Sequence, residues 1–347
     1  MQAVRTLKIL GLAVAVGGIM FLPAVATASS AGASPAAGAS PAAGEGVPAF
    51  GHVFLIIGEN TGLNQVNKTD MPFFVGTVKP GAAWLTNYSG VTHFSEANYV
   101  AMTSGQFTAC QQADGTPAAC HQDVPNLFSQ LDAAGLSWKV WAESMPTGCF
   151  LSSAGADATL NPYAPKHNPA IFFDSIEGAG GVWSASSQSA ECLSNDTPAG
   201  TTGPNDMSIF NAATAAGTVA RYNMIVPNLC EDAHDSCKQP PGNRITQFDR
   251  FLQREVPLIE ASPAFGTDGV LIITFDEGTL TSINQADKFG SGGRTAFAVV
   301  SPLAVPGTYA QTADHYSLLR TIEDGFGITS FLGNAAAVTP INTIWKP

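Results

Sequence analysis

Positive charge is scarce in this sequence, which carries 15 Lys and Arg against 27 Asp and Glu and has a formal net charge of −12. A nucleic-acid binder needs a basic surface that displaces counterions from phosphate, so we expect no nucleic-acid partner. Charged residues of both signs are few, at 12%, whereas hydrophobic residues reach 45%. That balance excludes a fully disordered chain. The length of 347 residues fits one large domain or roughly two average ones.

Long apolar runs are lacking except near the N-terminus. Arg5 and Lys8 precede an apolar stretch, residues 9–28, that ends in Ala-Thr-Ala. This order predicts a secretory signal peptide over residues 1–28 and hence a secreted, extracellular protein with no transmembrane anchor after cleavage. The alternative is an uncleaved membrane anchor, because the stretch is almost long enough to span a bilayer. Its glycines and Pro23 weaken it as a stable helix.

Residues 29–49 lack the apolar content of a core. They are rich in Ala, Gly, Ser and Pro, and the sequence ASPAAG occurs twice in tandem, at 33–38 and 39–44. Such a composition predicts a flexible linker. We therefore expect a single folded domain over residues 50–347.

Cys-x-x-Cys spacing is absent, which disfavours a thiolate metal site. An even number of cysteines in an exported chain favours disulfides instead. The short separations predict the pairs Cys110–Cys120 and Cys230–Cys237, which leaves Cys149 to pair with Cys192.

Short apolar runs alternate with helical patterns along the rest of the chain. The runs at 52–57, 222–226, 270–275 and 296–300 are typical of strands covered on both faces. Helical patterns cover 126–135, 245–259 and 315–326. This alternation predicts an α/β fold, a three-layer α/β/α sandwich with a mostly parallel central sheet.

Polar side chains follow the apolar runs, at the points where the strands would end. They are Glu59 and Asn60; Asn228, Asp232 and His234; Asp276 and Glu277; and His315, ahead of the last helix. Parallel strands would bring them to one edge, where α/β folds bind ligands. Each alone is more often a cap or a turn residue. Together they are suitable ligands for one or two divalent cations.

The segment 92–105 places Ser95 at the start of a helix. Its hydroxyl would lie near unpaired backbone N–H groups, where an anion is stabilised, and a cation there would make it a nucleophile. Asn98, one turn on, would face the same anion. In the alternative reading Ser95 is simply a helix cap. Spacing does not separate these two interpretations.

Six segments carry a resemblance to a known family: HVFLIIGEN (52–60), THFSEANYVAMTSG (92–105), YAPKHNP (163–169), VPNLCEDAHD (226–235), ITFDEG (273–278) and DHYSLLRTIEDGFG (314–327). They resemble the metal-dependent phosphoesterases, which include secreted acid phosphatases and bacterial phospholipases C and are related to the alkaline-phosphatase-like superfamily. The likeness spans residues 50–330 and is greatest to small secreted bacterial acid phosphatases. It implies an alkaline-phosphatase-like catalytic domain that hydrolyses phosphate monoesters, phosphoinositides among them.

The resemblance also implies roles for individual residues. Ser95 corresponds to the nucleophile that becomes phosphorylated, and Asn98 to the asparagine that holds the phosphoryl group. The ligands that share a metal with Ser95 would be Glu59, Asn60, Asp276 and Glu277. The opposite side, which would bind a second metal or the phosphate and leaving group, would comprise Asn228, Asp232, His234 and His315.

We expect His234 or His315 to protonate the leaving oxygen and then to activate water. His167 matches a histidine of the active-site rim, with Lys166 beside it for substrate charge. His93 adjoins the nucleophile and would bind substrate, act as a ligand or hold the backbone.

Three classes of function are compatible with these residues. The first is a phosphomonoesterase acting on a small phosphate ester or a phospholipid head group. The second is a phosphodiesterase of the phospholipase C type. The third is an exported binding module with structural Ca²⁺. The oxygen-rich ligand set favours Mg²⁺, Mn²⁺ or Ca²⁺ without excluding zinc or iron. Metal count and oligomeric state stay open.

Overall fold

The computed structural model describes residues 45–106, 110, 113–154, 162–178, 188–238, 241–279 and 292–347. The chain divides into two compact units, residues 1–39 and 40–347. The predicted signal peptide and residues 29–44 of the predicted linker lie outside the described residues. The linker prediction extends too far, because Val47 is fully buried and Glu45 pairs with Arg320 at 2.7 Å. The packed unit therefore includes residues 45–49.

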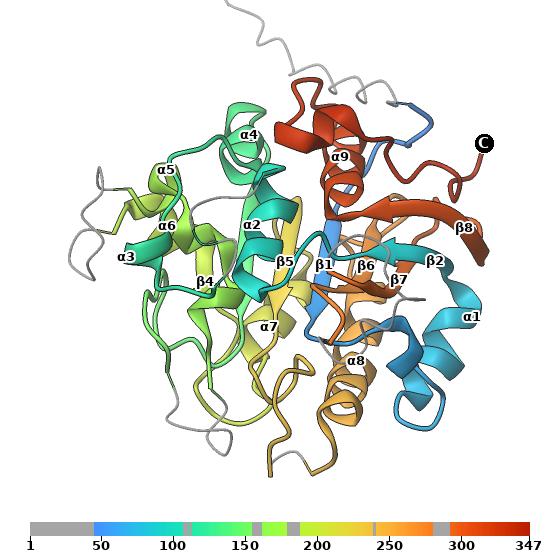
Figure 1. Cartoon of the computed structure of the whole chain (residues 1–347), viewed down its shortest axis with the longest axis horizontal. Helices are drawn as coiled ribbons and strands as arrows, with labels where there is room; N and C mark the ends of the chain where they lie inside the picture. Colours follow the sequence, from blue (N-terminus) through green and yellow to red (C-terminus); the bar gives the residue numbers. More distant parts are fainter. Residues whose placement is uncertain are drawn as a thin grey trace, which may run out of the picture. The chain divides into compact units, whose positions relative to one another are not determined.

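An eight-stranded sheet forms the centre of the second unit, in the order β4-β3-β5-β1-β6-β7-β2-β8 (Figure 1). The strands are β1 (Val53–Gly58), β2 (Ala83–Ser89), β3 (Trp138–Ala142), β4 (Asp196–Pro198), β5 (Tyr222–Val226), β6 (Val270–Phe275), β7 (Arg294–Val300) and β8 (Gly307–Asp314). Among these eight described strands, only β7 runs antiparallel to its neighbours, β6 and β2. The prediction of a mostly parallel sheet is therefore confirmed.

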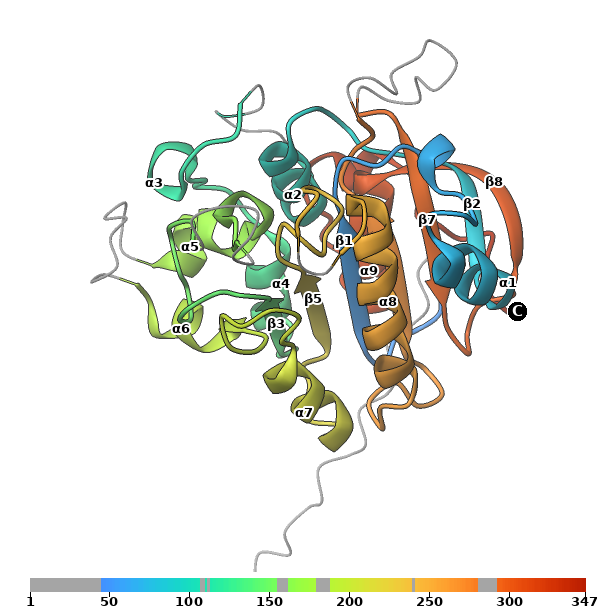
Figure 2. The ribbon, with the colours of Figure 1, turned by 90° about the horizontal axis from the view of Figure 1, so that it is seen from below.

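Helices cover both faces of this sheet (Figures 1 and 2). They are α1 (Lys79–Gly81), α2 (Ser95–Ser104), α3 (Pro117–Cys120), α4 (Leu127–Ala133), α5 (Asp174–Glu177), α6 (Ala190–Asn195), α7 (Ser208–Ala216), α8 (Arg244–Glu260) and α9 (His315–Gly325). Shorter turns include η1 (Leu63–Gln65), the π-turn η2 (Phe74–Val78), η3 (Pro165–His167), η4 (Pro169–Phe172) and η6 (Gly333–Ala337). In the described residues, none of the helices is long and apolar enough to span a bilayer.

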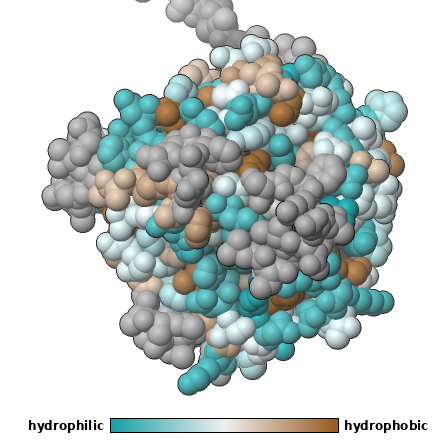
Figure 3. Space-filling view, in the orientation of Figure 1, coloured by the Kyte–Doolittle hydropathy of each residue, from teal (hydrophilic) through white to brown (hydrophobic). Residues whose placement is uncertain are grey.

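Two hydrophobic cores lie on opposite sides of the sheet, because successive strand residues point to opposite faces. In β1, Val53, Leu55 and Ile57 pack into the core that α2, α4 and α9 complete. Phe54 and Ile56 pack into the other, which α7 and α8 complete. The strands β1, β5 and β6 are buried along their whole length, which explains why their sequences are largely apolar. On the face drawn in Figure 3, hydrophobic residues of the described chain are scattered among hydrophilic ones.

Three disulfides join Cys110 to Cys120, Cys149 to Cys192 and Cys230 to Cys237. All three predicted pairs are confirmed. The last one closes the loop after β5, which carries the predicted site residues Asp232 and His234. Such cross-links restrict the loops that surround the carboxyl edge of the sheet.

Asp196 is a buried carboxyl that makes stability depend on pH. Burial raises its pKa to about 7, and hydrogen bonding from Asn168, 2.8 Å from Oδ1, opposes the rise only partly. Between about pH 4 and 7 the folded chain retains a proton that the unfolded chain has lost, so stability falls as pH rises through that window. The substitution Asp196→Asn removes this ionisable carboxyl.

We therefore expect Asp196→Asn to unfold at a temperature several degrees above wild type at pH 8 and close to it at about pH 4. The difference corresponds to a free energy on the order of 1 to 4 kcal/mol. Thermal unfolding at both pH values measures it. An equal shift at both pH values would show that ionisation of Asp196 is not the cause.

Candidate active site

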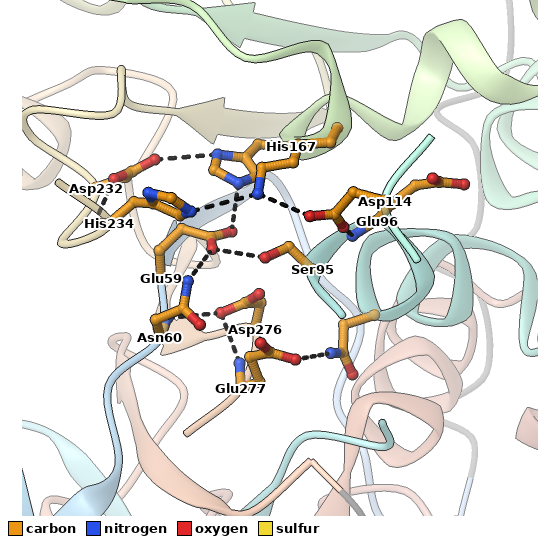
Figure 4. A network of polar contacts seen from close by, with 12 residues as sticks. Glu59, Asn60, Ser95, Glu96, Asp114, His167, Asp232, His234, Asp276 and Glu277 are labelled. Atoms are coloured by element: carbon orange, nitrogen blue, oxygen red, sulfur yellow. Dashed lines mark hydrogen bonds and ion pairs between the residues drawn. The ribbon is translucent and has the colours of Figure 1, made fainter. Parts of the chain in front are cut away.

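The carboxyl ends of three adjacent parallel strands supply most of the site (Figure 4). Glu59 and Asn60 follow β1, Asp232 and His234 lie in the loop after β5, and Asp276 follows β6. The predicted convergence of these loops is thus observed. It arises because β1 pairs with β5 on one side and β6 on the other, so the three strands end together.

Ser95 begins α2 and faces the end of β1. Its Oγ donates a hydrogen bond to Oε2 of Glu59 at 2.9 Å, and the residue is only 3% exposed. The N-cap position belongs to Phe94, whose side chain makes no cap. The interpretation of Ser95 as a simple helix cap is therefore wrong. The hydroxyl points at a carboxylate, at a helix end where backbone N–H groups stabilise negative charge.

Asp276 lies on the other side of Asn60. Its Oδ1 accepts the backbone N–H groups of Asn60 at 3.0 Å and of Glu277 at 2.6 Å, whereas its buried Oδ2 has no hydrogen-bond partner. Asn60 has a left-handed φ of 47°, which is costly for a residue with a side chain. Its amide also donates to Oε2 of Glu59 at 3.1 Å. The turn at Asn60 therefore directs the carboxylates of Glu59 and Asp276 toward the same part of the site.

His167 lies at the centre of the cluster. It is 1% exposed, stacks on Tyr99, and places Nε2 3.2 Å from Oε1 of Glu59 and Nδ1 3.1 Å from Oδ2 of Asp232. The prediction of a position on the rim is wrong. These are ion-pair distances without the angles of hydrogen bonds, so Nε2 and the two carboxylate oxygens remain unsatisfied. Burial lowers the pKa of His167 well below its usual value, and Lys166 and His234 add to this.

His234 and Lys166 form the accessible side of the site. The ammonium of Lys166 lies 3.3 Å from Nε2 of His234 and 2.8 Å from Oδ2 of Asp114. Since an ammonium only donates, Nε2 accepts, and Nδ1 of His234 carries the hydrogen that faces Asp235 at 2.8 Å. Burial and then Lys166 lower the pKa of His234, while Asp235 opposes this.

His315 is buried behind Asp276 and does not reach the accessible side. Its Nε2 lies 2.5 Å from the carbonyl oxygen of Asp276, and its Nδ1 lies 2.8 Å from the hydroxyl of Tyr88. A carbonyl only accepts, so Nε2 carries the hydrogen and Nδ1 accepts from Tyr88. Burial lowers the pKa of His315 to about 4. Both ring nitrogens of His315 therefore make structural hydrogen bonds to neighbouring protein groups.

Three further predicted residues are engaged with neighbouring groups. Asn98 donates to Oε2 of Glu277 at 3.0 Å and accepts from the backbone of residues 91 and 92, so it braces the loop before Ser95. Nδ1 of His93 lies 3.0 Å from the same Oε2. Asn228 donates to Ser144 and accepts from the N–H of Cys230, so both ends of its amide make hydrogen bonds outside the carboxylate cluster.

Arg244 and Ala233 matter to the site but were not anticipated. Arg244, the first residue of α8, donates to the hydroxyl of Thr61 at 3.0 Å and to the carbonyl of Ala233 at 2.5 Å. It thereby joins the loops after β1 and β5. Ala233 has a left-handed φ of 76°, between Asp232 and His234. The sequence carried one signal for Arg244. A cation in the first turn of a helix is disfavoured by the helix dipole, so its presence there indicates that it has another role.

The electrostatics of the cluster suit a divalent cation. Burial, and then repulsion from Asp276 and Asp232, raise the pKa of Glu59 well above its usual range, and burial likewise raises those of Asp232 and Asp276. Burial also raises the pKa of Glu277 to about 8. The unsatisfied atoms Oε1 of Glu59, Oδ2 of Asp232 and Oδ2 of Asp276 are hard oxygen donors. Ligand atoms of Glu59, His167 and His234 also lie within 4.8 Å of one another.

Comparison with known proteins agrees with this geometry. A phosphatidylinositol-3-phosphatase from Mycobacterium tuberculosis is 27% identical over 300 residues, which cover 86% of this chain and 84% of that protein. A probable acid phosphatase from Kluyveromyces lactis is 28% identical over 279 residues, which cover 79% of this chain and 58% of that protein. A structure from the alkaline phosphatase superfamily of Vibrio parahaemolyticus aligns with a TM-score of 0.53 at 10% identity, over 83% of this chain and 69% of that one.

That structural likeness shows the fold alone, and it confirms the predicted alkaline-phosphatase-like architecture. The model of the Phosphoesterase family matches residues 51–329, which include every loop of the site described above. The chain therefore belongs to the phosphoesterase family and is a hydrolase that acts on phosphate ester bonds.

Proposed function

We propose that the chain is a metal-dependent phosphatase that hydrolyses phosphate monoesters through a phosphoserine on Ser95. The observation that carries the proposal is the hydroxyl of Ser95, 2.9 Å from Glu59, in a cluster of buried carboxylates with unsatisfied oxygens. The names of both curated relatives support a phosphatase. The three disulfides and the predicted signal peptide support an exported enzyme.

Glu59, Asn60, Ser95 and Asp276 would hold the cation, with Asp232, His167 and His234 available on the opposite side for a second. Bound there, the cation would supply positive charge that stabilises phosphoryl oxygens and lowers the pKa of the Ser95 hydroxyl. Glu277 would be held in place by Asn98, which donates to it at 3.0 Å. The cluster thus orients the nucleophile before substrate arrives.

Each of the two steps of the reaction requires two proton transfers. Oγ of Ser95 forms a bond to phosphorus as the bond to the leaving oxygen breaks, and the Ser95 proton passes to Oε2 of Glu59. The leaving oxygen takes the proton held between Nζ of Lys166 and Nε2 of His234, which lie 3.3 Å apart. Water then attacks phosphorus and gives a proton back to these nitrogens, while Oγ of Ser95 leaves and recovers its proton from Glu59. His234 suits this role better than His315, whose ring nitrogens both face protein groups.

Hydrolysis of p-nitrophenyl phosphate and of bis(p-nitrophenyl) phosphate by the purified protein tests the proposal. We expect turnover of the monoester, with the diester hydrolysed at least about tenfold more slowly, because a diester lacks the third free oxygen that the site neutralises. Preferential hydrolysis of the diester would favour a phosphodiesterase of the phospholipase C type. Hydrolysis of neither ester, with several divalent metals tried, would contradict the proposal.

A further inference from the structure

A cavity of about 670 Å³ opens beside the active site, and none of the catalytic steps above uses it. Its walls include Pro117, Ala118, Phe150, Leu151 and Leu229, with Asp114 and Lys166 on the side of the catalytic residues. This volume lies within the range of pockets that enclose small organic ligands. The cavity is therefore large enough for the alcohol part of an ester.

The position of Lys166 connects the cavity with the chemistry. Its ammonium lies 3.3 Å from Nε2 of His234 and carries the proton that the leaving oxygen would take, and its side chain also lines the cavity. Leu229, in the same loop as His234, lines the cavity as well. When the leaving oxygen lies next to Lys166 and His234, the carbon skeleton attached to it would extend into the cavity.

The wall that carries Ala118 is tied to the nucleophile. The backbone N–H of Glu96, next to Ser95, donates to Oδ1 of Asp114 at 3.1 Å, and the backbone N–H of Gly115 donates to Oε2 of Glu96 at 2.8 Å. Through these two bonds the loop that precedes α3 is held to the first turn of α2. The distance between the wall and Ser95 is therefore set by the protein and does not depend on the substrate.

Each of the three disulfides adjoins a wall of the cavity. Cys110–Cys120 closes the loop that contains Ala118, Cys149 directly precedes Phe150, and Cys230 directly follows Leu229. Cross-linked walls lose little conformational freedom when a ligand enters. The cavity is therefore preformed.

The charge of the cavity indicates which alcohols fit. Among the described lining residues only Asp114 and Lys166 are charged, and they neutralise each other at 2.8 Å. An anionic alcohol would find no free cation there, whereas the apolar side chains offer contact to a ring or a chain. On the basis of the proposed function, we infer that this cavity binds the alcohol part of the ester and selects neutral, partly apolar alcohols of ring size or larger.

Two neighbouring alanines of α3 provide a matched test. Ala118 and Ala119 are both exposed, but only Ala118 lines the cavity. Ala118→Trp fills the space, so we expect kcat/KM for 1-naphthyl phosphate to fall at least about tenfold and that for glycerol phosphate to change less than about twofold. Ala119→Trp should change neither. Comparison of each variant with wild type on the same ester cancels the intrinsic reactivity of the leaving group.

An equal loss on both esters, or no loss on either, would overturn the inference. Calorimetric binding of 2-naphthol keeps the test independent of turnover. Wild type and Ala119→Trp should bind it and Ala118→Trp should not, while the anionic 6-hydroxy-2-naphthoate should bind wild type more weakly. Absence of binding to wild type, or tighter binding of the anion, would contradict the inference even if the protein proves to be a phosphatase. Binding of 2-naphthol without ester hydrolysis would instead contradict the proposed function alone.

Discussion

Ser95→Ala is expected to lower kcat for p-nitrophenyl phosphate by at least about 10³-fold, because the route through a phosphoserine is lost with the hydroxyl. The substitution removes one oxygen that contacts Oε2 of Glu59 at 2.9 Å and leaves the helix, which has no side-chain cap, otherwise unchanged. Folding should therefore be retained. Steady-state kinetics with matched thermal unfolding curves measure both effects.

Ser104→Ala is the control for that experiment. Ser104 is buried at the opposite end of α2, and within the described part of the chain its hydroxyl donates to the carbonyls of residues 100 and 106. We expect its kcat to stay within about threefold of wild type, since a helix-end hydroxyl that bonds only to backbone carbonyls contributes mainly to stability. Near-normal turnover by Ser95→Ala would rule out the phosphoserine mechanism. Trapped ³²P on wild type but not on Ser95→Ala would support it directly.

Removal of divalent cations should lower turnover by an amount similar to that expected for Ser95→Ala. The unsatisfied oxygens of Glu59, Asp232 and Asp276 lie in one buried cluster whose carboxyl pKa values are raised by burial and mutual repulsion. A cation would relieve that repulsion as well as enable chemistry. We expect exhaustive chelation to reduce turnover to below about 1% and to lower the unfolding temperature, with both restored by the correct cation.

The unfolding temperature makes this prediction independent of catalysis. Asp276→Asn should lose most of the rise in unfolding temperature that the cation produces in wild type. Asp249→Asn is the matched control, because Asp249 is a buried carboxylate whose oxygens accept the backbone N–H groups of Phe73 and Phe74, outside the cluster. It should lower stability but retain the response to the cation. An unchanged response in Asp276→Asn would show that the cation binds elsewhere.

Local sequence patterns determined much of this protein. The boundaries of β5 and β6, at Tyr222–Val226 and Val270–Phe275, coincide with the apolar runs, because a strand buried on both faces is largely apolar. The polar residues that follow β1, β5 and β6 converge because adjacent parallel strands end at one edge. The disulfide pairs followed from short separations, and the family followed from several motifs in order.

Only the tertiary structure decided where the individual side chains point. His167 and His315 both come from segments that carry the family resemblance, yet one lies among the carboxylates and the other behind Asp276. Arg244 joins two loops that no sequence spacing relates to it, and Asp114 reaches both α2 and Lys166 from a disulfide loop. Such placements depend on packing between segments far apart in the chain. A local pattern specifies a strand or a helix, but not the neighbours that its side chains meet.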